Sequence, residues 1–380
     1  MNLLLAFVPV ALLLRTLMPE QPLLAFGAAM LAIVPLADAI RKATEHLAET
    51  TGPALGGLLN VTFGNVSELI LALFVLSAGH QEVVKGQITG AIIGNALLGL
   101  GLAILAGSRS GTRQTFDRRA VGLQSSMLIL SVVGLLLPAL FHYTEAAQVS
   151  TARTALLDEK LSLGASVVLV VLYIGYLVFT LRGPTAHPDS AEGEAEALVE
   201  EEHRHGPNRG SGEGSGHVPD GPVWPWKKAL GVLVGATLIV VLMSETVSAT
   251  LEASADRLGL STFFLGVVLL AVVGAAAEYL SAIYFARRGR MDLVLGITLG
   301  STIQIALLVA PVLVLASWAM GTPMNLVFEN PLELIAVAAV AFSVNAIAHD
   351  GETHWYEGML LVGVYALFVI AFFFATPPVG

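Results

Sequence analysis

Long apolar segments separated by short polar breaks run through the whole chain and predict a bundle of membrane-spanning helices. Each segment has about 20 residues, the length that crosses the hydrocarbon core of a bilayer. The first segment lacks a basic leader and Arg15 interrupts its far end, so we interpret it as a spanning helix rather than a cleaved signal. The pattern predicts an all-α polytopic membrane protein with about 11 helices: 3–18, 22–40, 54–79, 86–107, 122–141, 161–181, 229–250, 261–286, 291–318, 328–349 and 356–375.

The composition agrees with this prediction. The 380 residues are 55% hydrophobic and 13% charged, about half of the ~25% charged residues that soluble domains carry. Cysteine is absent, which excludes disulfides, thiolate metal sites and cysteine nucleophiles. A net charge of −10 does not suit a nucleic-acid binder.

The basic residues predict the orientation in the membrane. One set of alternate loops holds 14 of the 19 Lys and Arg residues, and cytoplasmic loops are the basic ones. The amino terminus is therefore predicted in the cytoplasm and the carboxyl terminus outside, with the plasma membrane as the expected location. The loop at 350–354 is the exception, because it should be cytoplasmic but has no basic residue.

The sequence also matches itself at an offset of 210 residues. From 64–106 against 274–316, 13 of 43 positions are identical without a gap, and Glu68 aligns with Glu278. Because each repeat holds five predicted helices, the second must be inverted in the membrane. We therefore expect an amino-terminal helix (1–19), a first repeat (20–182), an acidic cytoplasmic linker (183–222) and a second repeat (223–380).

The paired glutamates are the candidate ion site, because inverted repeats place their substrate near the midplane where the halves meet. Asn65 and Gly64 lie on or near the helix face of Glu68, and Gly274 precedes Glu278 by the same four residues. One charged carboxylate at mid-bilayer costs roughly 2.5–3.5 kcal/mol. A divalent cation or two protons would neutralise the pair, which predicts exchange. Alternatively, each glutamate is a neutral acid bonded to a neighbouring helix.

The expected ligands are all oxygen atoms, which suits a hard cation such as Ca2+. Two carboxylates and the Asn65 amide supply too few oxygens, so water and backbone carbonyls freed near Gly64 or Gly274 must complete the set. The helix at 86–107 carries Gly86, Gly90 and Gly94 at a spacing of four, which favours close helix packing.

Further polar residues in the predicted spans are weaker candidates. Some could hold or hydrate the glutamates or only make interhelical hydrogen bonds: Asn95, Ser301, Thr302 and Gln304. Others could form an entrance relay for ions or protons, or be solvated or bonded to neighbouring helices: Asp38, Glu45 and Glu245. The linker at 183–222 has nine acidic residues against two arginines, and is either a solvated tether or a segment that binds a regulatory cation.

Several motifs resemble the Ca2+/cation:proton antiporter family of the cation/Ca2+ exchanger superfamily. The motifs are Val34-Pro-Leu-Ala-Asp38, Ala43-Thr-Glu45, Gly64-Asn-Val-Ser-Glu68, Met291-Asp292 and Gly300-Ser-Thr-Ile-Gln304. The resemblance covers nearly the whole chain. It implies that Glu68 and Glu278 bind Ca2+ and protons alternately, that a proton gradient drives Ca2+ outward, and that the acidic linker contributes to regulation.

One motif departs from the family pattern. The family usually has Gly-Asn-Ala-Ala-Glu-His in the second repeat, where this chain has Ala275 for Asn and Tyr279 for His. The expected function is Ca2+/H+ antiport, with no cofactor besides the transported ions and no enzymatic activity. Because one amide ligand is missing, Na+-driven exchange or transport of Mn2+, Na+ or K+ stays open, and a cation channel is a more distant alternative.

Overall fold

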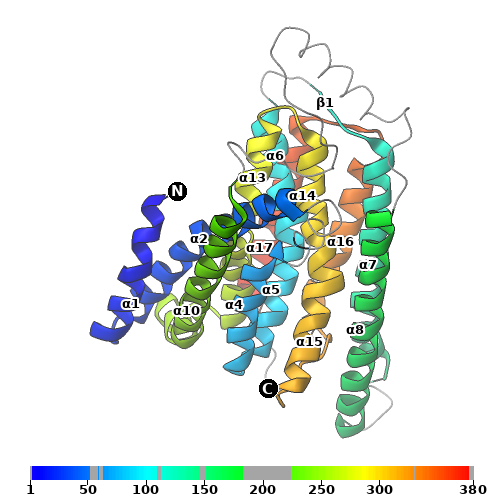
Figure 1. The fold of residues 1–380 in the computed structure, drawn as a ribbon. Coiled ribbons are helices and arrows are strands. Elements are labelled where there is room, and N and C mark those ends of the chain that lie inside the picture. Colours follow the sequence, from blue (N-terminus) through cyan, green and yellow to red (C-terminus); the bar gives the residue numbers. More distant parts are fainter. Residues whose placement is uncertain are drawn as a thin grey trace.

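The computed structural model describes residues 2–51, 59, 63–108, 113–145, 151–182, 224–328 and 330–375. The acidic linker expected at 183–222 and most of the segment at 52–62 lie outside these residues. The described part is almost entirely helical (Figure 1). The predicted fold class is thus confirmed.

The described residues include seven helical stretches that are long and apolar enough to cross a membrane. They are α2 (Pro22–Thr51), α5 to α6 (Gln81–Gly107), α7 (Arg118–Glu145), α8 (Thr151–Arg182), α10 (Trp226–Leu258), α14 to α15 (Met291–Ala319) and α17 (Trp355–Phe374). The chain is therefore an integral membrane protein, as its apolar segments predict.

An eighth stretch is bent by 50° between Gly274 and Ala276. It consists of α11 (Thr262–Phe264), the π-helical turn η4 (Leu265–Leu270), α12 (Ala271–Gly274) and α13 (Ala276–Ala286). Shorter apolar helices complete the described set: η1 (Asn2–Ala6) leading into α1 (Phe7–Leu17), α4 (Val66–Ser77) and α16 (Pro331–Ile347). The number of complete spans, predicted as 11, stays a prediction.

The helix boundaries follow the 210-residue offset of the sequence repeat. Helices α4 and α13 begin at 66 and 276, α5 and α14 at 81 and 291, and α6 and α15 at 100 and 310. A π-helical turn interrupts the stretch from α5 to α6 as η2 (Gly94–Gly99), and another interrupts the stretch from α14 to α15 at the corresponding place as η5 (Ile305–Val309). Such turns inside α-helices are frequent at functional sites, because they release the regular hydrogen-bond pattern.

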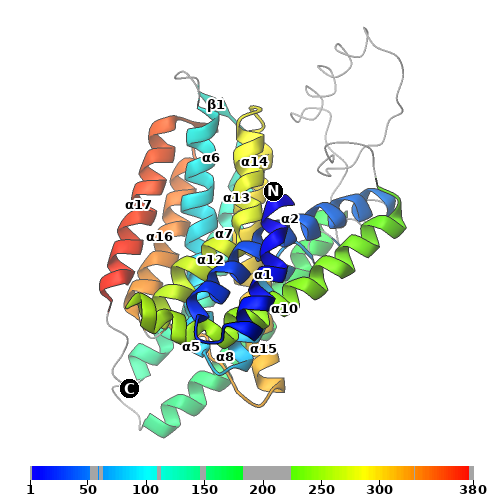
Figure 2. The ribbon, with the colours of Figure 1, turned by 90° about the vertical axis from the view of Figure 1, so that its left-hand side faces the viewer.

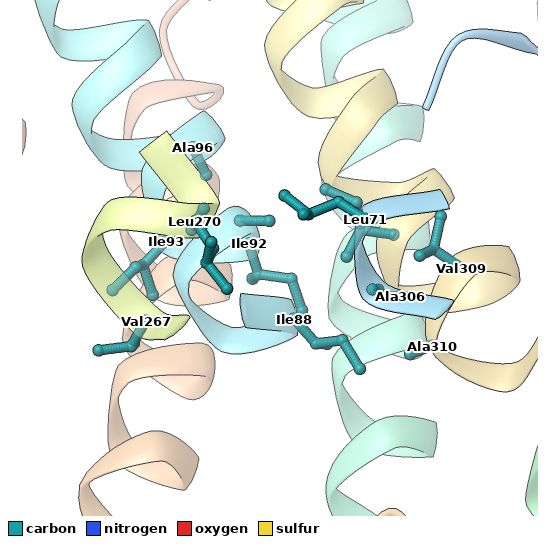
Figure 3. Close-up of a cluster of buried hydrophobic side chains, with 14 of the residues drawn as sticks. Leu71, Ile88, Ile92, Ile93, Ala96, Val267, Leu270, Ala306, Val309 and Ala310 are labelled. Carbon is teal, nitrogen blue, oxygen red and sulfur yellow. The ribbon is translucent and has the colours of Figure 1, made fainter. Parts of the chain in front are cut away.

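The helices form two groups in space. Helices α2 and α10 lie side by side and run obliquely beside the upright α6, α14, α16 and α17 (Figure 2). Helix α1 packs against α2. Buried apolar side chains of α4, α5, η4 and η5 meet between the two repeats, as Figure 3 shows for Leu71, Ile88, Ile92, Val267, Leu270 and Ala306.

Glycines allow α5 and η4 to touch through their backbones. A Cβ atom added to Gly90 would lie 2.0 Å from the carbonyl oxygen of Val267, and one added to Gly266 would lie 2.4 Å from that of Val83. Both distances are far below van der Waals contact. The close helix approach predicted from the glycine spacing is therefore confirmed, and it joins the first repeat to the second.

A short two-stranded sheet closes one end of the bundle. Strand β1 (Gln114–Thr115) pairs antiparallel with β2 (Glu352–Thr353), and Arg113 forms an ion pair with Glu352 at 3.0 Å. The loop at 350–354, which has no basic residue of its own, thus lies beside a loop that carries several arginines.

Candidate functional site

Both candidate glutamates occupy the third position of a helix that starts after a break. Glu68 follows the turn at Gly64–Asn65, and Glu278 follows the break at Ala275. Asn65 and Ala275 have similar backbone angles, φ −108° and ψ 23° against φ −87° and ψ 9°. The first turn of a helix favours a negative carboxylate, because its free N–H groups and dipole are positive.

The two repeats meet at these glutamates. A Cβ atom added to Gly274 would lie 3.0 Å from Cγ and 3.4 Å from Oε1 of Glu68. The glycine of the second repeat therefore packs directly against the glutamate of the first. The two glutamates are 4% and 8% exposed, and they are close enough to interact electrostatically. The structure brings Glu68, Glu278 and Gly274 together.

Three carboxylate oxygens are among the buried polar atoms of this region that have no hydrogen-bond partner in the described part of the chain. Among the described residues, neither oxygen of Glu68 and not Oε2 of Glu278 has a hydrogen-bond partner, although all three are buried. An ionised carboxylate buried without a partner costs several kcal/mol. This arrangement is stable only when a cation binds between the groups or when protons neutralise them.

Asn65 is held by a residue of the second repeat. Its Nδ2 donates a hydrogen bond to Oε1 of Gln304 at 2.8 Å, and its Oδ1 is buried with no partner in the described part of the chain. The bond directs the amide nitrogen toward Gln304 and leaves the carbonyl oxygen without a protein partner in the described residues. The interhelical bond expected for Gln304 exists, and it orients a candidate ligand.

The remaining residues predicted on α14 and η2 differ in what they contact. Asn95 is fully buried in η2, and its side-chain oxygen and nitrogen have no partner among the described residues. Thr302 is buried but donates its hydroxyl to the carbonyl of Thr298 at 2.7 Å. Ser301 is also buried on α14. Asn95 is therefore better placed than Thr302 to offer polar atoms to a ligand.

The two candidate acids of α2, Asp38 and Glu45, are ion-paired rather than free. Arg41 binds Asp38 at 3.0 Å and also Glu45, while Lys42 binds Asp38 at 2.7 Å. Helix α2 packs against α12 and α13, and Asp38 and Arg41 are close enough to Glu278 to interact with it electrostatically. This cluster borders the site. Its ion pairs favour the interpretation that these acids are bonded within the helix over the interpretation that they form an entrance relay.

Glu245 lies away from the other candidates. Its carboxylate pairs with Arg15 of α1 at 2.8 Å, and its side chain is 47% exposed. The structure therefore does not bring Glu245 to the glutamate pair.

Three contributors were missed by the sequence reasoning or noted only in passing. Gln87 donates its side-chain N–H to the carbonyl of Glu68 at 3.4 Å. Arg41 is the partner of two predicted acids, and Tyr279 was noted only as a departure from the family motif. A polar residue in an apolar run was the available signal for Gln87, since it requires a partner in the membrane. Arg41 lies just beyond the predicted span 22–40 and gave no such signal.

In the described residues, no group of three or more His, Asp or Glu side chains could hold a metal ion. A cation at this site would therefore have two carboxylates and otherwise neutral oxygen donors. Such a ligand set favours a hard cation over zinc or copper.

Comparisons with known proteins agree with one another. The sequence model of the family described as "Sodium/calcium exchanger protein" matches residues 22–182 and 228–374. A Ca(2+)/H(+) antiporter of Aphanothece halophytica is 40% identical, with 99% of this chain and 97% of the relative covered. The Ca(2+)/H(+) antiporter ChaA of Bacillus subtilis is 36% identical, with 92% and 91% covered. The solved structure of native YfkE is similar, with a TM-score of 0.79, 32% identity, and 98% and 99% of the two chains covered.

Proposed function

The chain belongs to the sodium/calcium exchanger protein family, and from this premise we propose that it exchanges Ca2+ for H+ across a membrane. The resemblance inferred from the motifs is confirmed, because full-length relatives are Ca2+/H+ antiporters by name. The members of this family are transporters rather than enzymes, which agrees with the prediction from the sequence. The finer assignments that follow are our own.

One observation carries the proposal. Two buried glutamates, Glu68 and Glu278, lie in the first turns of repeat-related helices and come together across Gly274. Both oxygens of Glu68 and Oε2 of Glu278 lack hydrogen-bond partners among the described residues. Two ionised carboxylates carry two negative charges, which one Ca2+ or two protons neutralise. Each neutral state is accessible in the membrane, and the state with two uncompensated charges is costly.

The ion-binding residues follow from this pair. Glu68 and Glu278 bind the ion, Asn65 contributes its carbonyl oxygen, and the breaks at Gly64 and Gly274 leave backbone carbonyls available. Protons and Ca2+ compete for the same carboxylates, so the release of one allows the binding of the other. Movement of one repeat against the other then exposes the site to each side in turn.

The orientation is proposed from the charges of the loops. The basic loops lie in the cytoplasm, the amino terminus is cytoplasmic, and the carboxyl terminus is outside, in the plasma membrane. The pairing of β1 with β2 supports this assignment. It joins the loop at 350–354 to the arginine-rich loop before α7, so the two lie on the same side.

The domain organisation is proposed from the sequence repeat: an amino-terminal helix (1–19), two inverted repeats (20–182 and 223–380) and the acidic linker (183–222) between them. The linker binds a regulatory cation through its carboxylates. Deleting 190–205 should change the Ca2+ dependence of uptake and leave the maximal rate intact. An unchanged Ca2+ dependence would contradict the regulatory role.

Transport in proteoliposomes with an imposed pH gradient tests the function. Ca2+ uptake should dissipate the gradient, and Glu68→Gln and Glu278→Gln should each reduce exchange to background, because a glutamine carries neither the charge nor the titratable proton. Glu245→Gln is the matched control, since that glutamate also lies on a long apolar helix but pairs with Arg15. It should retain uptake.

Other outcomes identify the alternatives. Normal Ca2+ uptake in either glutamine variant would refute the site. Uptake that follows a Na+ gradient instead of the pH gradient would show that Na+ rather than H+ is the counter-ion. Stronger uptake of Mn2+, Na+ or K+ would show that the substrate is that ion rather than Ca2+.

A further inference from the structure

The repeat offset shows that the two halves of the site have different neutral side chains. In the first half, Asn65 bonds to Gln304 across the repeat interface. The positions 210 residues away from these two are Ala275 and Gly94. Neither has a polar side chain, so the Glu278 half lacks the amide pair of the Glu68 half.

A tyrosine hydroxyl lies at the corresponding place. A Cβ atom added to Gly94, the counterpart of Gln304, would lie 2.3 Å from Oη of Tyr279. The ring packs beside Gly99, where an added Cβ would lie 2.7 Å from Cδ1. Tyr279 follows Ala275 by four residues, so the two share a helix face. Two glycines of η2 thus make room for the ring and its hydroxyl.

The Tyr279 hydroxyl is buried, and its hydrogen-bonding capacity is unused in the described part of the chain. Tyr279 is 6% exposed, and its Oη has no hydrogen-bond partner among the described residues. The neighbouring Asn95 of η2 is equally without partners in that part of the chain. Tyr279 is also close enough to both Glu68 and Glu278 to interact electrostatically. A buried hydroxyl left without a partner is costly, and native proteins rarely retain one without a ligand or water.

We propose that the Tyr279 hydroxyl is the neutral polar group of the Glu278 half of the ion site, in the place of the missing amide pair. Its single O–H has no acceptor among the described residues; when the pair is ionised, it donates one hydrogen bond to one carboxylate oxygen and thereby holds that group in position for Ca2+. Tyr279 is a positioning residue, and the inference rests on the proposed Ca2+/H+ exchange. Its counterpart in the first repeat is Leu69, so the two halves reach a polar site by different side chains.

Removing the hydroxyl alone is the first test. Tyr279→Phe keeps the ring against Gly99 and should raise the KM for Ca2+ about tenfold, the effect of losing a hydrogen bond to a charged group. The maximal rate should change less than twofold. Tyr173→Phe is the control, because that hydroxyl of α8 is also buried without a partner among the described residues. It should leave the KM unchanged.

Placement of the hydroxyl is tested by a suppressor pair. Gly94→Ala should impair uptake, because its Cβ would lie 2.3 Å from Oη; without that hydroxyl, the nearest ring atom is Cζ at 3.6 Å, an ordinary contact. The double variant Gly94→Ala with Tyr279→Phe should therefore recover the uptake of Tyr279→Phe alone. Ala275→Asn added to Tyr279→Phe should lower the KM again, since it restores an amide at the repeat-related position.

Each outcome has a defined meaning. Absence of pH-driven Ca2+ uptake in the unmodified protein would refute the proposed function. Normal wild-type exchange together with an unchanged KM in Tyr279→Phe would refute the inference alone. Ca2+-dependent thermal stabilisation in detergent separates binding from folding: Tyr279→Phe should lose part of the stabilisation by Ca2+ while its melting temperature without Ca2+ stays near that of the wild type. A loss of stability without Ca2+ and no change in the Ca2+ effect would refute it too.

Discussion

The Glu68 and Glu278 halves of the site share their charged group and its helical setting and differ in the polar side chains around it. Each glutamate is the third residue of a helix after a break, and each repeat has a π-helical turn after the following helix. The Glu68 half has the Asn65–Gln304 amide pair. The Glu278 half has Ala275 and Tyr279 instead, and Arg41 lies near enough to act on its carboxylate.

This difference separates what the ion requires from what the scaffold can vary. In the proposed site the two negative charges balance the cation, and no neutral side chain can replace that balance in a medium of low dielectric constant. Neutral oxygens and hydrogen-bond donors are interchangeable, because an amide, a hydroxyl, a backbone carbonyl or water can fill the same place. The symmetry of the repeats is therefore kept in the carboxylates and lost in their neighbours.

Among changes around the two glutamates, the largest effect is expected where the halves touch. Gly274→Val should reduce Ca2+ uptake by about a hundredfold, because even a Cβ there would lie 3.0 Å from Cγ of Glu68 and a branched side chain would displace that glutamate. Gly235→Val on α10 is the control, since an added Cβ meets nothing within 4 Å there. Uptake should be measured at saturating Ca2+, and near-normal uptake in Gly274→Val would show that the halves separate at this point during transport.

A smaller effect is expected from the amide pair. Gln304→Leu should raise the KM for Ca2+ about fivefold, because Asn65 loses the acceptor that orients its amide and the loss of a neutral hydrogen bond is of that size. Gln304→Glu keeps an acceptor oxygen and should retain the orientation of Asn65. The comparison is a Ca2+ titration of initial uptake rates. An unchanged KM in Gln304→Leu would mean that the pair serves packing only.

The smallest effect is expected from the charge beside the Glu278 half. Arg41→Gln should lower the KM for Ca2+ about threefold, because it removes a positive charge that repels the incoming cation. Arg41→Lys keeps the charge and should behave as the wild type. Because Glu45 loses its partner in Arg41→Gln, the double variant with Glu45→Gln is needed as well. A KM that returns to the wild-type value in the double variant would assign the effect to Glu45 instead.

Much of the architecture could be predicted from the sequence because membranes impose few choices. Lipid offers no hydrogen bonds to the backbone, so apolar segments of this length must be helices. The spacing of the glycines in α5 predicted a close helix contact, and the structure shows that α5 makes this contact with η4. The paired glutamates were visible because charge is rare in such segments and the offset aligned them. The ion pair of Glu245 could not be predicted, because its partner Arg15 lies 230 residues away in the chain.

The sequence by itself determined the helical membrane fold, the repeat and the two carboxylates, since these follow from hydropathy, periodicity and the cost of buried charge. Only the tertiary structure decided which neutral groups stand beside each glutamate. Gln304 reaches Asn65, and Tyr279 reaches Gly94, across contacts between segments that are far apart in the chain. Such contacts depend on helix packing at the scale of single atoms. The place of Tyr279, which stands where the family has His, can be interpreted only once the glycines that pack against its ring are known.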